Sequence, residues 1–159
     1  MTTEKPLDFD LLDTQLRALI ASETDLLANS ANFVALLYQA LPDINWLGLY
    51  VLRENELLLG PFQGKPACAR IPLGRGVCGS AARHRKTLRI DRVHDFEGHI
   101  ACDAASNSEL VVPLSANGIL LGVLDIDSPL SGRFSEYDQQ GIEKVCCSFE
   151  KTLAGRDFI

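Results

Sequence analysis

One cysteine of this 159-residue chain stands in a polar stretch between Gly98 and Pro113. Cys102 is followed directly by Asp103 and preceded by His99, with small residues around them. A core cysteine usually lies within an apolar run, where it acts as a small hydrophobe. A thiol in a polar loop can instead ionise and react. The stretch therefore predicts a reactive cysteine at position 102.

Carboxyl groups and aromatic rings follow patterns that suit a binding pocket. Glu109 begins an apolar run, and Asp125 and Asp127 end the next one. Trp46 and Tyr50 are four residues apart in a run of strand formers, so they share one face of a strand. Carboxylates brought together repel, which raises the pKa of at least one and allows it to donate a proton. The same residues also fit core aromatics and polar caps at a strand end.

The other cysteines are Cys68, Cys78, Cys146 and Cys147. An odd total of five, with no secretory signal at the start, argues against a structural disulfide framework. Cys78 stands at the start of a predicted helix and fits either a buried thiol or a redox group. Cys146 and Cys147 are adjacent in the last predicted helix and face different directions, so we expect both to be structural.

Composition and charge indicate one soluble domain. A length of 159 residues fits a single core, and 47% hydrophobic and 23% charged residues are ordinary values. The net charge of −6 argues against nucleic acid as a partner, and no apolar run reaches the length of a membrane span. We expect a cytoplasmic protein with a flexible start at residues 1–10. His94 and His99 with Cys102 lack the spacing of a zinc site, so we expect no metal.

The order of the predicted elements is that of an α+β fold with an antiparallel sheet. Helices are predicted at residues 11–20, 31–41 and 77–84, and a last helix is predicted to begin after Ser135. Ser22 and Ser135 are the predicted N-caps. Strands are predicted at 45–52, 56–60, 67–71, 87–90, 109–115 and 119–127. The irregular segment 91–108 contains Cys102, and so long a loop in a small domain is usually functional.

The turn between the last two strands decides which residue Glu109 faces. A two-residue turn at 117–118 places Glu109 opposite Ile126, whereas a three-residue loop places it opposite Asp125. Only the second register puts Glu109 on the same strand face as the two aspartates. We favour it if these carboxyls form one site.

Five segments of the sequence form a distinctive set: Gly64–Cys68, Gly74–Gly79, Asp91–His94, Gly98–Asp103 and Ser106–Glu109. Together they resemble the free methionine-(R)-sulfoxide reductases, which are GAF-domain enzymes. The spacings of 10 residues between the first two cysteines and 24 from the second to the third also match. The similarity extends from about the second helix to the last. It implies that residues 1–159 form a single GAF domain with a central antiparallel sheet and flanking helices.

The resemblance also implies an oxidoreductase that converts free methionine-(R)-sulfoxide to methionine and acts against oxidative stress. Cys102 corresponds to the nucleophile, which becomes a sulfenic acid, and Cys68 to the resolving cysteine, which forms an intramolecular disulfide with it. Cys78 corresponds to a third cysteine that some members use for resolution. Thioredoxin, which draws on NADPH, would reduce the disulfide, and no bound cofactor is expected.

The substrate-holding residues of the family correspond to Trp46, Tyr50, Glu109, Asp125 and Asp127. We expect Glu109 or Asp127 to supply the proton. Family members are often dimers, and the apolar first and last helices are compatible with a homodimer. The rival hypotheses are a non-enzymatic GAF module that senses a small ligand and a thiol-based redox sensor, because a fold does not fix a function.

Overall fold

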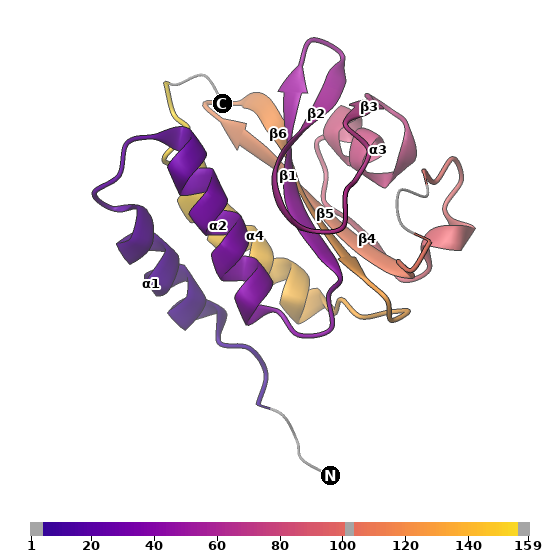
Figure 1. Ribbon diagram of the computed structural model, residues 1–159, viewed down its shortest axis with the longest axis horizontal. Helices are drawn as coiled ribbons and strands as arrows, with labels where there is room; N and C mark the ends of the chain where they lie inside the picture. Colours follow the sequence, from indigo (N-terminus) through magenta and orange to yellow (C-terminus); the bar gives the residue numbers. More distant parts are fainter. Residues whose placement is uncertain (1–4, 101–103, 156–159) are drawn as a thin grey trace.

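The computed structural model describes residues 5–100 and 104–155. Its centre is an antiparallel sheet of six strands in the order β3-β2-β1-β6-β5-β4 (Figure 1). The elements in chain order are α1 (Phe9–Ile20), α2 (Leu26–Ala40), β1 (Trp46–Arg53), β2 (Glu56–Gly64), β3 (Arg70–Pro72), α3 (Gly76–His84), β4 (Leu88–Ile90), the 3-10 helix η1 (Val93–Asp95), β5 (Ser108–Ala116), β6 (Ile119–Ser128) and α4 (Glu136–Glu150). The predicted α+β class with a central antiparallel sheet is confirmed.

The sheet separates two hydrophobic cores. Helices α2 and α4 cover one face and α1 packs against these two helices, whereas α3 covers part of the other face (Figure 1). Leu47, Leu49 and Val51 of β1 point to the side of α2 and α4, whereas Trp46 and Tyr50 point to the α3 side. This alternation, predicted from the sequence, follows from the two-residue period of a strand. None of the helices in residues 5–100 and 104–155 has the length and apolar character needed to cross a membrane.

The first helix starts earlier than the sequence indicated. Asp8 is its N-cap, with a carboxylate that accepts a hydrogen bond from the amide of Leu11 at 3.0 Å. Phe9 is 4% exposed, and its ring packs so tightly on Gly141 of α4 that a Cβ there would overlap it. The flexible start was expected through Asp10, but residues 9 and 10 are helical, with the Asp8 cap before them and the contact between Phe9 and Gly141 holding the first turn on α4.

Two further caps were predicted, with different outcomes. Ser135 accepts a hydrogen bond from the amide of Asp138 and forms a full capping box with it, which confirms the predicted start of α4. The cap predicted at Ser22 is wrong. Asp25 caps α2 instead, because its carboxylate accepts from the amide of Ala28 at 2.8 Å.

The β5–β6 hairpin closes through a two-residue turn. Asn117 and Gly118 have φ angles of 53° and 75°. Two consecutive residues with left-handed backbone conformations form the turn whose twist matches that of the flanking strands. Asn-Gly is the sequence that adopts this turn most readily. The three-residue loop favoured from the sequence is therefore wrong.

A β-bulge then changes the register of the same hairpin. Leu121 is an extra residue on β6 where the pairing shifts, so that Glu109 lies opposite Asp127. The predicted pairing of Glu109 with Asp125 is wrong. Because Asp125 and Asp127 are two residues apart on one strand, all three carboxyl groups nevertheless share the α3 face.

Candidate functional site

Three neighbouring strands bring the predicted binding residues into register. Asp127 of β6 lies between Trp46 of β1 and Glu109 of β5 and is opposite both. Asp125 lies two residues along β6, opposite Gly48. The antiparallel pairing therefore assembles an indole and three carboxyl groups that are far apart in the sequence.

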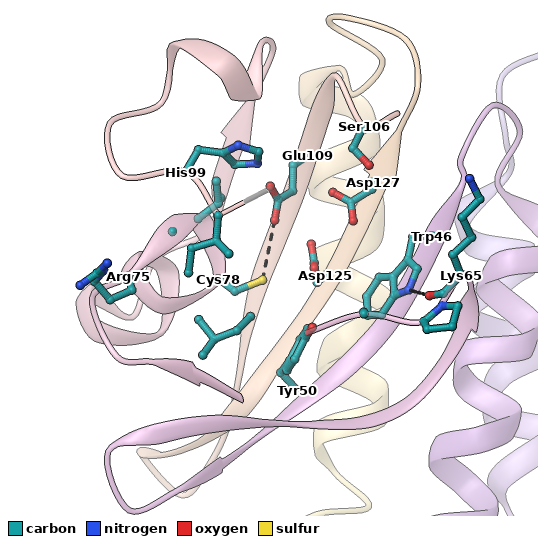
Figure 2. A pocket seen from close by; sticks show the side chains of 16 residues that line it. Trp46, Tyr50, Lys65, Arg75, Cys78, His99, Ser106, Glu109, Asp125 and Asp127 are labelled. Atoms are coloured by element: carbon teal, nitrogen blue, oxygen red, sulfur yellow. Dashed lines mark hydrogen bonds between the residues drawn. The ribbon is translucent and has the colours of Figure 1, made fainter. Parts of the chain in front are cut away.

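A pocket lies between this part of the sheet and α3 (Figure 2). Its cavity volume of about 50 Å³ exceeds the roughly 10–15 Å³ that one water molecule needs. Six residues that the sequence predicted for the site line this pocket: Trp46, Tyr50, Cys78, Glu109, Asp125 and Asp127.

The two aromatic residues form one wall of the pocket and also hold a neighbouring segment. The rings of Trp46 and Tyr50 stack with their centroids 5.9 Å apart. The indole Nε1 of Trp46 donates to the carbonyl of Lys65 at 3.0 Å, and the hydroxyl of Tyr50 donates to the carbonyl of Cys68 at 2.9 Å. The segment that contains Cys68 is thus tied to the pocket wall at two points.

Gly48 makes room for this wall. A Cβ on Gly48 would lie 2.5 Å from both the Cη2 atom of Trp46 and the Cβ of Phe62. Without that atom, the indole stacks on Phe62 with ring centroids 5.4 Å apart. A glycine at this strand position therefore permits the ring to lie across β1.

A thiol and two carboxyl groups meet at the base of the pocket. One ligand atom from each of Cys78, Glu109 and Asp125 lies within 4.8 Å of the others. The Cys78 thiol donates to Oε1 of Glu109 at 3.7 Å (Figure 2). Glu109 and Asp125 are each 6% exposed, and Oδ1 of Asp125 has no hydrogen-bond partner. These three residues are called the thiol–carboxyl cluster below.

Burial changes the protonation of this cluster. It raises the pKa of Glu109 well above its usual range, and the charges of Asp125 and Asp127 raise it further. Burial also raises the pKa of Asp125 from 3.8 to about 6, although interactions with Glu109 and Cys78 oppose the rise. The pKa of the Cys78 thiol is raised, chiefly by burial and then by the nearby carboxylates. Burial therefore favours the protonated forms of Glu109 and Cys78, and Asp125 titrates at about 6.

The described cysteines differ in their chemical state. Cys68 is disulfide-bonded, whereas Cys78, Cys146 and Cys147 are free thiols. Cys146 is buried and Cys147 exposed, and both lie on α4, on the opposite face of the sheet from the pocket. Of the free thiols in residues 5–100 and 104–155, Cys78 alone lines the pocket.

Cys102, the predicted nucleophile, lies outside the described residues. The chain on both sides of the undescribed stretch reaches the pocket, because Ile100 and Ser106 line it. Ile100 packs against the start of α3, where a Cβ on Gly76 would lie 3.2 Å from its Cγ1 atom.

Four polar residues line the pocket without having been assigned to it from the sequence: Lys65, Arg75, His99 and Ser106. All four belong to the segments that carried the family resemblance, which was the available signal. Burial and then the charge of His94 lower the pKa of His99, which favours a neutral imidazole.

Known proteins share this arrangement of sequence and fold. The GAF domain family matches residues 15–152. The free methionine-R-sulfoxide reductase of Escherichia coli (strain K12) is 54% identical over 147 residues, which are 92% of this chain and 89% of that protein. The chain belongs to the free methionine-R-sulfoxide reductase family of GAF-domain proteins.

Other members of the free methionine-R-sulfoxide reductase family support this assignment. The reductase of Saccharomyces cerevisiae is 44% identical over 131 residues, covering 79% of this chain and 73% of that protein. A solved structure of fRMsr of Staphylococcus aureus in complex with substrate superposes with a TM-score of 0.90 at 48% identity, covering 96% of this chain and all of that one. The predicted family and GAF fold are confirmed.

Proposed function

We propose that this protein is an enzyme that reduces free methionine-(R)-sulfoxide to methionine. The observation that carries the proposal is the thiol–carboxyl cluster in the pocket, where burial raises the pKa of Glu109 and so favours a protonated carboxyl group beside Asp125. Reduction of a sulfoxide needs a proton for the oxygen, and binding of an amino acid needs a negative charge for its ammonium group. The 54% identity to the Escherichia coli reductase supports the same reaction.

The pocket divides the substrate's groups among different residues. Asp125 and Asp127 receive the ammonium group, because they line the pocket side by side on one strand face. The methyl group packs on the indole of Trp46. Glu109 gives its proton to the sulfoxide oxygen, which makes the sulfur electrophilic. The hydrogen bond from Cys78 holds Oε1 of Glu109 and so orients that carboxyl group.

Cys102 supplies the two electrons for the reaction. Its thiolate attacks the activated sulfur and forms an S–S bond, while the S–O bond breaks and the protonated oxygen leaves as water. Water then attacks the sulfur of Cys102, which breaks the S–S bond, releases methionine and leaves the cysteine as a sulfenic acid. The positions of Ile100 and Ser106 at the pocket wall support this role, since they lie two residues before and four after Cys102.

Cys68 resolves the sulfenic acid. Its thiol displaces water to form a disulfide with Cys102, and the dithiol of thioredoxin then returns both to thiols. The disulfide-bonded state of Cys68 and the hydrogen bond that Tyr50 gives to its carbonyl support this assignment. Cys78 is less suited to resolution because its raised pKa keeps it a thiol.

A coupled assay tests the reaction. The protein is incubated with free methionine-(R)-sulfoxide, thioredoxin, thioredoxin reductase and NADPH, and loss of NADPH absorbance is followed. Substrate-dependent oxidation of NADPH is expected. Tight binding of the sulfoxide without turnover would refute the enzyme and favour a ligand-sensing GAF module.

Matched cysteine variants test the assigned roles. Cys102→Ser should abolish turnover, whereas Cys147→Ser, at an exposed thiol of α4, should retain it. Cys68→Ser should form about one methionine per protein and then recycle poorly with thioredoxin. Normal steady turnover of Cys68→Ser would transfer the resolving role to Cys78.

The carboxylates also predict a preference for the free amino acid. Methionine sulfoxide within a peptide has an uncharged amide in place of the ammonium group, so it leaves Asp125 and Asp127 without a cation. We expect a large fall in kcat/KM for N-acetylated methionine sulfoxide. Equal kcat/KM for the two forms would contradict the binding role of these residues.

A further inference from the structure

The thiol–carboxyl cluster has the composition of a metal-binding site as well as that of a proton donor. A cysteine sulfur and two carboxylate oxygens are ligands that zinc accepts together. No metal was predicted from the sequence, because His94 and His99 beside Cys102 lack the spacing of a zinc site. We propose that Cys78, Glu109 and Asp125 bind a thiophilic divalent cation such as Zn²⁺ at the base of the substrate pocket.

The spacing of the donor atoms suits a zinc ion. Zinc binds sulfur at about 2.3 Å and carboxylate oxygen at about 2.0–2.2 Å, so a tetrahedral ion separates the two donors by about 3.5 Å. The Sγ atom of Cys78 and Oε1 of Glu109 are 3.7 Å apart. Asp125 completes a set whose members all lie within 4.8 Å, and a small side-chain rotation would bring its oxygen to the same ion.

A second observation points to a ligand at this place. Oδ1 of Asp125 is buried without a hydrogen-bond partner. Figure 2 shows the Asp125 carboxyl group beside the hydrogen bond between Cys78 and Glu109. A buried oxygen without a partner is unfavourable, and a cation within the cluster would satisfy it.

Binding of the ion exchanges protons and involves no redox change. Zinc requires a thiolate and ionised carboxylates, so Cys78 and Glu109 release their protons to solvent when the ion binds. The pocket cavity leaves the fourth coordination position to water. The ion would occupy the groups assigned to the sulfoxide oxygen and the ammonium, so it would compete with substrate. This competition rests on the proposed function, whereas ion binding does not.

Cobalt spectroscopy tests the site without any turnover. The protein is kept with the disulfide at Cys68 intact, so that this sulfur cannot act as a thiolate ligand. Co²⁺ should produce a thiolate charge-transfer band in the near ultraviolet at one ion per chain. The band should be absent in Cys78→Ser and present in Cys147→Ser, the control at the exposed thiol of α4. No band in the wild type, or a band that survives in Cys78→Ser, would overturn the proposal.

Zinc affinity gives an independent measurement, by competition with a chromophoric chelator. Asp125→Asn should weaken Zn²⁺ binding about 100-fold, since even residues that only orient ligands contribute 10–100-fold. Equal affinity of wild type and Asp125→Asn would contradict the site. Free methionine-(R)-sulfoxide should lower the apparent Zn²⁺ affinity. If the sulfoxide does not change the Zn²⁺ affinity, the metal site is supported and the proposed position of the substrate is contradicted.

Discussion

The buried carboxyl group of Asp125 makes the stability of the fold depend on pH. Burial raises its pKa in the folded state from 3.8 to about 6, so the folded chain holds this proton more tightly than the unfolded chain. The contribution of the protonated Asp125 carboxyl group to folding stability is fully present below a pH of about 4 and is lost as the pH rises through about 6. Asp125→Asn removes the ionisation while keeping the shape of the side chain.

The size of the effect follows from the two pKa values. At 1.36 kcal/mol per pH unit, a rise from 3.8 to about 6 corresponds to about 3 kcal/mol. We therefore expect Asp125→Asn to match the wild type near pH 3.5 and to exceed its free energy of unfolding by about 3 kcal/mol at pH 7.5. For a chain of this length, the gain corresponds to a rise in Tm of about 6–12 °C. The variant should bind substrate poorly, because it lacks a charge for the ammonium group.

Urea unfolding at a series of pH values measures this difference. The fluorescence of Trp46 serves as the probe, because it is the single tryptophan and is 3% exposed. Subtracting the wild-type free energy of unfolding from that of the variant at each pH removes contributions that other groups share. Asp91→Asn, at an exposed aspartate, is the matched control and should stay within about 0.5 kcal/mol of the wild type.

Two results would refute the reasoning about Asp125. A difference between variant and wild type that does not change from pH 3.5 to 7.5 would mean that the carboxyl does not titrate in this range. A variant less stable than the wild type at pH 7.5 would mean that the ionised carboxylate is stabilised by a partner in the fold.

Three other substitutions have distinct expected outcomes. Glu109→Gln should slow methionine formation in a single turnover by about 100-fold or more, because an amide cannot transfer the proton; a rate within tenfold of wild type would assign the acid to another carboxyl. Tyr50→Phe should leave the rate of the first turnover unchanged and slow formation of the disulfide at Cys68 by about fivefold, since the hydrogen bond to the carbonyl of Cys68 is lost. Rapid-quench kinetics measure both steps, and equal slowing of the two would contradict this expectation. Gly122→Ala should lower the free energy of unfolding by about 3 kcal/mol, because the Cβ of the new alanine would overlap the carbonyl oxygen of Tyr50. An unchanged Tm would show that β6 can shift away from β1.

Local patterns in the sequence were sufficient for most of the fold. Alternation in β1 predicted which side chains face which core, and the capping residue Ser135 predicted the start of α4. Failures occurred where a distant contact decides the structure. Phe9 lies in the first turn of α1, where the Asp8 cap is supported by packing of the Phe9 ring on Gly141, some 130 residues away. Short-range propensity does not include that contact.

The hairpin register shows a different limit. Asn117 and Gly118 are a clear signal for a two-residue turn, yet the register was chosen to bring the carboxyl groups together. The bulge at Leu121 reconciles the two, since one extra residue shifts the pairing by one and returns Glu109 to the face of the aspartates. Nothing in the local sequence marked the position of that bulge.

The sequence by itself determined the family and predicted six of the residues that line the pocket, because the segments that carry the resemblance are contiguous. Only the tertiary structure decided how Cys78, Glu109 and Asp125 meet and how burial raises their pKa values. These properties depend on strand pairing across the sheet and on removal of water by α3. Both arise from packing between residues that are distant in the chain, and a linear pattern does not encode them directly.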